Sequence, residues 1–301
     1  MDNSVTSIDR SDHQDLTCAG QAVASSGLDL KPDLNLERQS GFENVTVHRF
    51  KDHQSTCALD QVVRELPVAL VYNGISHAVM MATPTDLEVF AKGFSLSEGI
   101  LSNLKELYAL DIQQNTLGIQ IEMTIASGAF ATLKAHRRMM IGRTGCGLCG
   151  IESLQQFHTP LSHITSKARA DWLKQIPIAV SKLQIQQDIS NVTGGAHAAA
   201  WVVDGQIVAL YEDVGRHNAL DKLLGHLAEK GCDVSAGFIV MTSRASYELI
   251  RKCAQFNIGL LASISAPTTL AIQMAKTAGL TLASFCRGNG FVVYTDDPDL
   301  F

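Results

Sequence analysis

GFIVMTSRASYELIRKCAQFNIGLLASIS, residues 237–265, predicts a short buried strand, a helix and a second buried strand in direct succession. The apolar runs at its two ends have the length of strands, whereas Leu249, Ile250 and Cys253 recur at the spacing of one helical face. Strands joined by helical crossovers of about ten residues or more are typical of a parallel or mostly parallel sheet. This stretch therefore predicts an α/β fold.

The same alternation continues on both sides of this stretch. Asp204 and Gly205 separate two apolar runs as a hairpin turn would, and Gly231 stands just past the end of an amphipathic run. The further elements that we expect are helices at 151–157, 166–176, 217–231 and 268–279, a hairpin at 201–211, and strands at 280–285 and 291–295. We expect these elements to form a mixed or parallel sheet with covering helices.

The chain before residue 142 shows mainly strand patterns. Asn73 and Gly74 lie between two apolar runs and predict a tight hairpin turn, and Thr83 or Thr85 could cap the helix that follows. The elements expected here are a strand at 45–50, hairpins at 67–83 and 108–125, and a helix at 83–100. Together they predict a smaller N-terminal subdomain of mixed α/β structure.

The chain divides into four expected segments. The first forty residues are rich in Ser, Asp and Gln and lack a sustained apolar period, so we expect them to be disordered. The segments are a polar tail (1–40), a strand-rich subdomain (41–141), a mobile loop (142–152) and an α/β domain with a cofactor pocket (153–301).

Composition excludes several classes of protein. A 301-residue chain that is 46% hydrophobic and 18% charged can bury a sizeable core, and its net charge of -6 argues against a nucleic-acid binder. It contains neither a secretory signal nor an apolar run of the ~18 residues that span a membrane, so we expect a cytoplasmic protein without a membrane partner. Its seven cysteines are irregularly spaced and are expected to be thiols.

The loops that follow the predicted strands contain small, polar and basic residues. Such loops lie side by side at the carboxyl ends of parallel strands, and three of them lead into helices, whose free N–H groups attract anions. Arg216, Arg244 and Arg287 would add phosphate donors. The pattern predicts a pocket for a phosphorylated, nucleotide-like ligand. The alternative is that the Ser and Thr residues of these loops only cap helices and that the arginines form surface ion pairs, with Glu212, Asp213 and Glu248 as partners.

A C-x-x-C pair, Cys146 and Cys149, lies in the glycine-rich stretch GRTGCGLCG (142–150). Four roles are open to it: buried structural residues, half of a zinc site, a redox dithiol, or a sulfur carrier that holds sulfane sulfur as a persulfide. Glycine supplies the backbone freedom that a carrier needs to reach both donor and acceptor. Basic residues precede the pair and would lower the pKa of its thiols: Lys134, His136, Arg137, Arg138 and Arg143. The alternative is that they form a solvated basic face, which would leave the reactivity of the thiols unchanged.

His197 lies in TGGAHAAAW (193–201), which is similar to the H-x-E motif of zinc nucleobase deaminases. Ala199 stands where that motif has its glutamate, so the proton shuttle is missing and deamination is disfavoured. Two alternatives stay open: a structural, hydrogen-bonded His197, and a zinc site in which His197 or Cys286 joins the C-x-x-C pair.

Six segments in order resemble the formate dehydrogenase accessory sulfurtransferases, the FdhD family. The resemblance covers roughly residues 44–297 and rests on GRTGCGLCG, TGGAHAAAW, YEDVGRHNALDKLLG, TSRASYELI, SAPTTLA and FCRGNGFVVYT. It implies a fold similar to that of cytidine deaminases, without their activity. It also implies a homodimer.

The same resemblance implies a specific transfer of sulfur. Family members take sulfur from a cysteine desulfurase and deliver it to the bis-molybdopterin guanine dinucleotide form of the molybdenum or tungsten cofactor, which the formate dehydrogenase catalytic subunit then uses. On this basis Cys146 carries the persulfide with Cys149 as its partner. The cofactor is bound as a substrate, and we expect no tightly held metal belonging to the protein.

The family's cofactor-binding stretch corresponds here to Phe285, Cys286, Arg287, Gly288, Asn289 and Gly290. The residues expected to complete the pocket are Arg216, His217, Ser243, Arg244 and His197. Cys286 is expected to form part of the pocket wall without a catalytic role. Two rival functions are a cofactor chaperone without persulfide chemistry and a zinc-dependent hydrolase.

Overall fold

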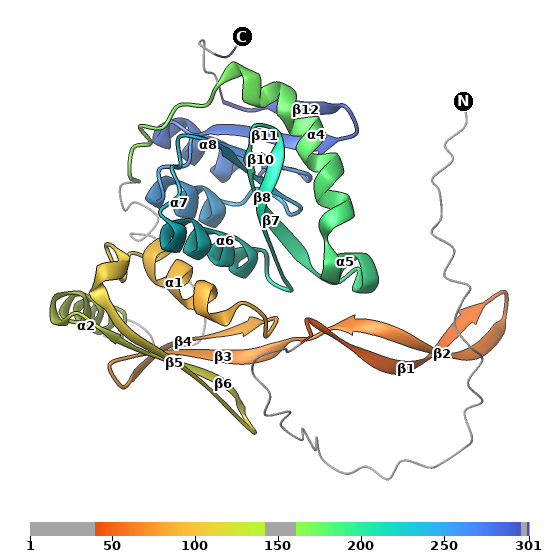
Figure 1. Ribbon diagram of the computed structural model, residues 1–301, viewed down its shortest axis with the longest axis horizontal. Helices are drawn as coiled ribbons and strands as arrows, with labels where there is room; N and C mark the ends of the chain where they lie inside the picture. The colour runs from red at the N-terminus through yellow and green to blue at the C-terminus, as the bar shows by residue number, and fades with distance from the viewer. Residues whose placement is uncertain (1–39, 142–160, 296–299, 301) are drawn as a thin grey trace.

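The computed structural model describes residues 40–141, 161–295 and 300 of the 301-residue chain. Two sheets and a two-stranded ribbon make up its strands (Figure 1). The expected disordered tail, apart from Ser40, and the expected mobile loop at 142–152 lie outside the described residues, as does the helix expected at 151–157. In the described part, no helix combines the length and apolarity needed to cross a bilayer.

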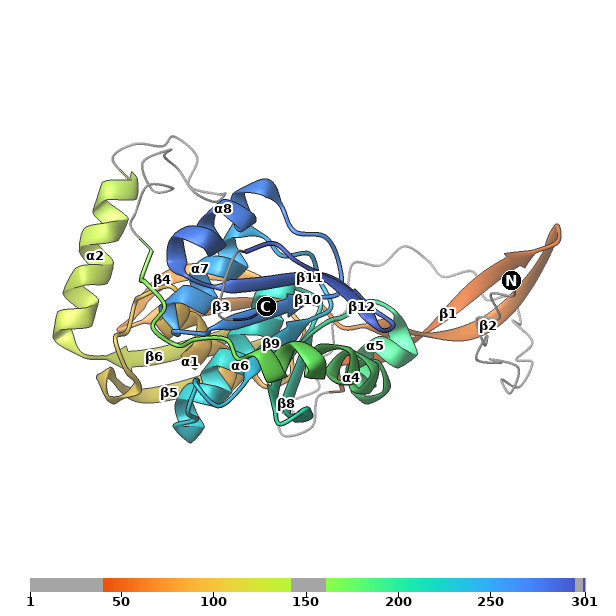
Figure 2. The same ribbon diagram turned by 90° about the horizontal axis from the view of Figure 1, so that it is seen from above.

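The N-terminal part consists of the ribbon and a four-stranded sheet in the order β4-β3-β6-β5. Its strands are β1 (Phe42–Lys51), β2 (Gln54–Val63), β3 (Leu66–Tyr72), β4 (Ile75–Ala82), β5 (Leu107–Asn115) and β6 (Gly118–Ile125). The two predicted hairpins are confirmed, and Asn73 and Gly74 take the positive φ angles, 47° and 78°, that a tight turn needs. The ribbon extends away from the body of the molecule (Figure 2).

The helices of this part are α1 (Leu87–Ser97), the short η2 (Leu104–Glu106) and α2 (Ser127–Ile141). The prediction that Thr83 or Thr85 caps α1 is wrong, because the N-cap is Asp86, in a left-handed conformation with φ 55°. Thr83 Oγ1 instead accepts a hydrogen bond from the Val214 amide at 3.0 Å. Thr85 Oγ1 accepts one from Lys222 Nζ at 3.2 Å, so both threonines bind the C-terminal part.

The C-terminal part is built on a six-stranded mixed sheet in the order β12-β11-β10-β9-β7-β8. Its strands are β7 (His197–Val203), β8 (Gln206–Asp213), β9 (Phe238–Met241), β10 (Leu260–Ser263), β11 (Thr281–Arg287) and β12 (Gly290–Val293). Its helices are α4 (Ala170–Gln186), α5 (Asp188–Thr193), α6 (Arg216–Lys230), α7 (Tyr247–Gln255) and α8 (Thr269–Ala278). The α/β class is confirmed; the likeness to cytidine deaminases stays a prediction.

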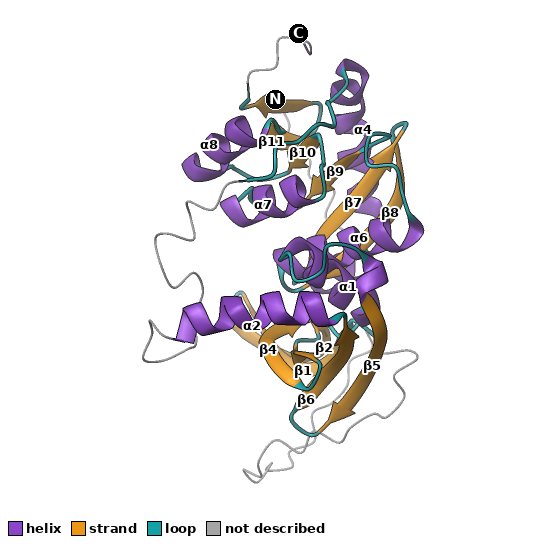
Figure 3. Ribbon diagram, turned by 90° about the vertical axis from the view of Figure 1, so that its left-hand side faces the viewer, coloured by secondary structure: helices purple, strands orange, loops and turns teal. Residues whose placement is uncertain are grey.

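Apolar clusters fill both sides of this sheet. Helices α6, α7 and α8 bury one face, where Trp201, Ile239 and Leu261 pack, and α4 buries the other, where Val240 and Ala262 pack (Figure 3). Side chains alternate between the two clusters along each strand, as the strand period of two requires. Burial on both faces explains why these strands are short, continuous apolar runs in the sequence.

The two parts meet where α1 crosses α6 through a pair of glycines. A Cβ atom added at Gly93 would lie 1.8 Å from the Asp221 carbonyl oxygen, and one added at Gly225 would lie 1.9 Å from that of Val89. Neither position can hold a side chain without pushing the helices apart. This contact fixes the N-terminal sheet against the C-terminal part (Figure 1).

A buried ionic network joins α1, α6 and α7 beside this crossing. Lys252 Nζ lies 2.9 Å and 3.0 Å from the two carboxylate oxygens of Asp221 and 2.6 Å from Glu98 Oε1, and it donates to Ser97 Oγ at 2.8 Å. Burial alone would lower the pKa of Lys252, but the two carboxylates raise it above its usual value. Lys252 is therefore charged and holds three helices together.

The four cysteines within the described residues differ in state. Cys57, in β2, forms a disulfide bond, so the expectation that every cysteine is a thiol is wrong at this position. Cys232, Cys253 and Cys286 are free thiols, and the latter two are buried.

Candidate functional site

The carboxyl ends of four strands meet at one edge of the six-stranded sheet. Strands β9, β10 and β11 run parallel, and β7 is antiparallel to both β8 and β9, so β8 points the same way as β9. The loops after β8, β9, β10 and β11 therefore leave the same edge, as the sequence predicted. Three of these loops lead into α6, α7 and α8. We refer to this edge as the carboxyl edge.

Backbone and hydroxyl hydrogen bonds connect the neighbouring loops of the carboxyl edge. The Ala198 amide donates to Thr242 Oγ1 at 2.9 Å, which joins the start of β7 to the end of β9. Ser263 Oγ and Ser284 Oγ lie 2.7 Å apart, which joins β10 to β11. The small polar residues of these loops thus hold the edge together. Thr268 also caps α8 through its side chain, whereas Ser246, the N-cap residue of α7, makes no side-chain cap hydrogen bond.

One group of predicted residues gathers where β7 begins and β8 ends. His197 is the β-ladder partner of Asp213, and Arg216 and His217 open α6 directly after β8. Burial first, and then the positive charges of Arg216 and His217, lower the pKa of His197. His197 is therefore neutral at neutral pH and lies beside the guanidinium of Arg216, which favours an anionic ligand.

Glu248, from the first turn of α7, faces this group. Its Oε2 lies 2.5 Å from His217 Nε2 and 4.0 Å from Arg216 Nη2. This close contact with His217 is the main cause that lowers the pKa of Glu248. The alternative to a phosphate site was that the arginines pair with acids such as Glu248. Arg216 does form this pair, at the limit of ion-pair distance.

The other two proposed arginine partners bind elsewhere. Glu212 accepts hydrogen bonds from the amides of Ile189 and Ser190, both at 2.8 Å, at the start of α5. Asp213 pairs with Lys222 at 2.8 Å, and the side chains of both are fully buried. The prediction of surface pairs is therefore wrong for these two acids.

The buried Lys222–Asp213 pair lies directly beneath the group and was missed by the sequence analysis. Asp213 also accepts from the Gly215 amide at 2.8 Å and from Asn218 Nδ2 at 2.9 Å, which fixes the first turn of α6. The sequence does contain a signal for this pair. Asn218 and Lys222 stand four residues apart, so they lie on the same face of the helix that begins shortly after Asp213.

The second group of predicted residues is the turn between β11 and β12. Residues 285–287 continue past the last residue of β10 through a β-bulge, where Phe285 takes φ 55° and is 42% exposed. Arg287 Nε donates to the Ile264 carbonyl oxygen at 3.1 Å. Gly288 has φ 54° and, like Gly290, has open space where a Cβ would stand. This turn overhangs the carboxyl edge.

Cys286 points away from that overhang. Its side chain is buried in the cluster beneath α4, and burial raises the pKa of its thiol to about 12. Ser243 is buried with its hydroxyl on the Arg244 carbonyl oxygen at 3.1 Å, whereas Arg244 is exposed. Cys286 and Ser243 therefore support the edge, and Phe285, Arg244 and Arg287 present accessible side chains or backbone there.

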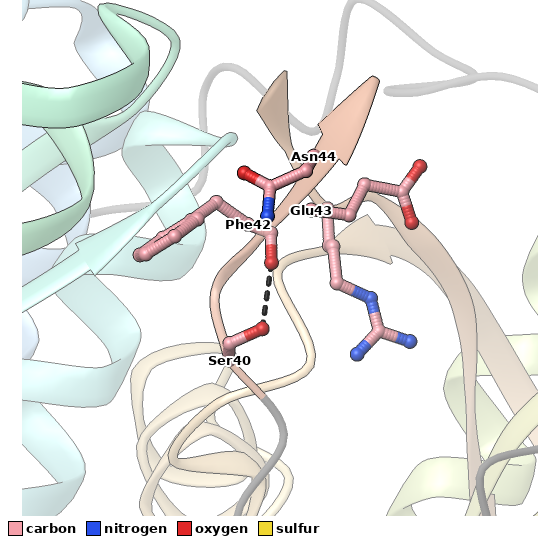
Figure 4. Close-up of a pocket in the computed structure, with 5 residues that line it drawn as sticks. Ser40, Phe42, Glu43 and Asn44 are labelled. Carbon is pink, nitrogen blue, oxygen red and sulfur yellow. Dashed lines mark hydrogen bonds between the residues drawn. The ribbon is translucent and has the colours of Figure 1, made fainter. Parts of the chain in front are cut away.

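The two groups share an edge but are separated along it. Strands β7 and β11 are three positions apart in the sheet, or about 14 Å at a strand spacing of about 4.8 Å. A pocket lies elsewhere, at the foot of the ribbon, lined by Ser40, Phe42, Glu43, Asn44 and Arg64 (Figure 4). None of the predicted site residues lines that pocket.

The two cysteines predicted to carry the chemistry, Cys146 and Cys149, lie outside the described residues. Among the residues that are described, no group of three or more His, Cys, Asp or Glu side chains is arranged to hold a metal ion.

Comparison with known proteins identifies the family. The model of the FdhD/NarQ family matches residues 63–300. The sulfur carrier protein FdhD of Acinetobacter baylyi is 60% identical over 255 residues, covering 85% of this chain and 93% of the relative. The sulfur carrier protein FdhD of Cupriavidus necator is 50% identical over 249 residues, covering 82% and 86%.

A solved structure supports the same assignment of the fold. The crystal structure of a proposed formate dehydrogenase accessory protein from Desulfotalea psychrophila superposes with a TM-score of 0.66 at 20% identity, covering 87% of this chain and 100% of that one. The order of motifs, the matched family model and the relatives of up to 60% identity agree. This chain belongs to the FdhD/NarQ family.

Proposed function

We propose that this protein is a sulfur carrier that serves formate dehydrogenase, and that Cys146 holds the sulfur. One observation carries the proposal: the C-x-x-C pair lies within residues 63–300, which match the family model, and the curated relatives are named sulfur carrier proteins. The protein thus acts as a sulfurtransferase with a persulfide intermediate.

The donor that we propose is a cysteine desulfurase bearing a persulfide. The Cys146 thiolate attacks the outer sulfur of that persulfide, the sulfur–sulfur bond of the donor breaks, and the donor cysteine leaves as a thiolate. The sulfane sulfur passes from one cysteine to another, so the step needs no further oxidant or reductant. Cys149 stands three residues away and is the candidate to relay or release the sulfur.

The acceptor that we propose is bis-molybdopterin guanine dinucleotide, bound as a substrate at the carboxyl edge. Support comes from the arginines of the carboxyl edge, Arg216, Arg244 and Arg287, and from the helix N-termini beside them. Two groups about 14 Å apart suit a long ligand with phosphates along its length. We also propose, from the family likeness, a cytoplasmic homodimer.

Maturation of formate dehydrogenase in cells separates the carrier from a chaperone that only delivers cofactor. A strain lacking its own copy of this protein receives the wild-type chain, Cys146→Ala, or Cys232→Ala as a matched control for a free, half-buried thiol. We expect Cys146→Ala to abolish formate dehydrogenase activity and Cys232→Ala to retain it. Normal activity with Cys146→Ala at wild-type protein levels contradicts the proposal and favours the chaperone.

A further inference from the structure

Glu248 is the carboxylate that faces Arg216 and His217 at the start of α6. Its Oε2 lies 2.5 Å from His217 Nε2 and 4.0 Å from Arg216 Nη2, and its Oε1 accepts a hydrogen bond from the Tyr247 hydroxyl at 3.3 Å. The Glu248 side chain is 40% exposed, so dissolved ligands reach it. A carboxylate at a proposed site for anions needs an explanation, because its negative charge repels an anionic ligand.

Among the neighbouring acids, Glu248 is the one that would compete with an incoming anion for Arg216. Asp213 is fully buried and pairs with Lys222, so it does not neutralise Arg216. The buried Nε of Arg216 makes no hydrogen bond in the described part of the chain. Arg216 can therefore donate further hydrogen bonds, because the Glu248 carboxylate, 4.0 Å from its Nη2, does not take them up.

We propose that Glu248 is an internal counter-anion: its carboxylate occupies the place beside Arg216 and His217 that a diphosphate group takes, and the ligand must displace it. The inference rests on the anion site of the proposed function and assigns that site a residue that sets its affinity. Glu248 offsets the positive charge of Arg216 in the empty site and lowers the affinity of the site for small anions, so that a ligand with further contacts along the edge is favoured over them.

The probe for this proposal is inorganic pyrophosphate, titrated calorimetrically into the full-length protein. We expect Glu248→Gln to bind pyrophosphate at least about fivefold more tightly, since even in bulk water a like charge about 4 Å from an anion opposes binding by that factor. The gain should shrink as salt is added, because the site is half-exposed.

Glu98→Gln is the matched control. Glu98 is also a partly exposed glutamate in an ion pair, 46% exposed and 2.6 Å from Lys252, but this pair lies one helical turn further along α7. Its replacement should leave the pyrophosphate affinity unchanged. Adding Arg216→Gln to Glu248→Gln should remove the gain, because the freed guanidinium is its source.

The outcomes separate this inference from the function on which it rests. Unchanged or weaker binding by Glu248→Gln, with a wild-type circular dichroism spectrum, overturns the inference while the anion site stands. Absence of pyrophosphate binding in every variant overturns both. If Glu248→Gln does not fold, Glu248→Asp withdraws the carboxylate from His217 and should give a smaller gain of the same sign; no gain overturns the inference. Persulfide formation on Cys146 is independent of all these results.

Discussion

Replacing Lys252 by methionine tests the buried network that joins the two parts of the molecule. The Lys252 side chain is 7% exposed and that of Asp221 is 1% exposed. Without the ammonium group, the Asp221 carboxylate stays buried but loses its cation. It then keeps the hydrogen bond from Ser97 Oγ to Asp221 Oδ1, at 2.6 Å. A buried charge that loses its partner costs about 3–5 kcal/mol. This is a large part of a total stability of about 5–15 kcal/mol.

Urea unfolding measures this cost. The chain's two tryptophans, Trp172 and Trp201, are buried in the C-terminal part and report its unfolding, while circular dichroism reports the whole molecule. At a slope of about 3 kcal/mol/M, the midpoint for Lys252→Met should fall by about 1 M or more. Glu98→Gln, which removes the half-exposed partner, should cost no more than about 1 kcal/mol.

A second substitution decides the cause of the loss. Adding Asp221→Leu to Lys252→Met removes the stranded carboxylate and should recover most of the stability, because apolar replacements of a buried pair are often nearly neutral. A loss below about 1 kcal/mol for Lys252→Met, or no recovery in the double variant, would refute the reasoning.

Three further predictions concern single residues. Gly93→Ala should destabilise the protein by about 1–3 kcal/mol or more in urea unfolding, since its Cβ meets backbone 1.8 Å away, whereas Gly128→Ala, which meets nothing in α2, should stabilise it by about 0.4–1 kcal/mol. The Cys286 thiol, whose pKa burial raises to about 12, should resist iodoacetamide at pH 8 until the protein is unfolded, as read by peptide mass. In an NMR titration His197 should have a pKa below 6.5, and Arg216→Gln should raise it. Because the imidazole of His197 binds its proton more tightly in the unfolded chain, the free energy of unfolding should fall as the pH drops below about 6.5. The fall should be less steep in Arg216→Gln. A His197 pKa that is not below 6.5 in the folded protein contradicts this prediction.

Local signals in the sequence were sufficient for much of the fold. Asn73 and Gly74 marked a turn because few other residues accept positive φ, and the doubly buried strands around Val240 appeared as short apolar runs. Strand β2 was missed because the two-stranded ribbon covers neither of its faces fully, so its apolar and polar residues do not alternate cleanly. Helix α2 was missed because its basic residues leave a weak apolar stripe.

The sequence predicted which loops share the carboxyl edge, but not the contacts that their residues make. The sheet topology places the loops of Arg216, Arg244 and Arg287 at one edge, which follows from strand order alone. The partners of buried charges depend on which distant elements meet. The Lys222–Asp213 pair joins α6 to the end of β8, and Lys222 also donates to the Thr83 carbonyl oxygen of the N-terminal part. The helical spacing of Asn218 and Lys222 shows that they share a face, but it does not show that a segment more than a hundred residues away buries the pair.

The central claim is that Cys146 carries sulfur, and the mass of its peptide tests this most directly. The protein is incubated with a cysteine desulfurase and cysteine, digested without reductant, and the peptide containing residues 144–151 is weighed in the wild type, Cys146→Ala and Cys149→Ala. We predict one added sulfur atom, removable by reductant, in the wild type and Cys149→Ala and none in Cys146→Ala. An unmodified wild-type peptide while the desulfurase turns over, or an equal addition in Cys146→Ala, would contradict the account.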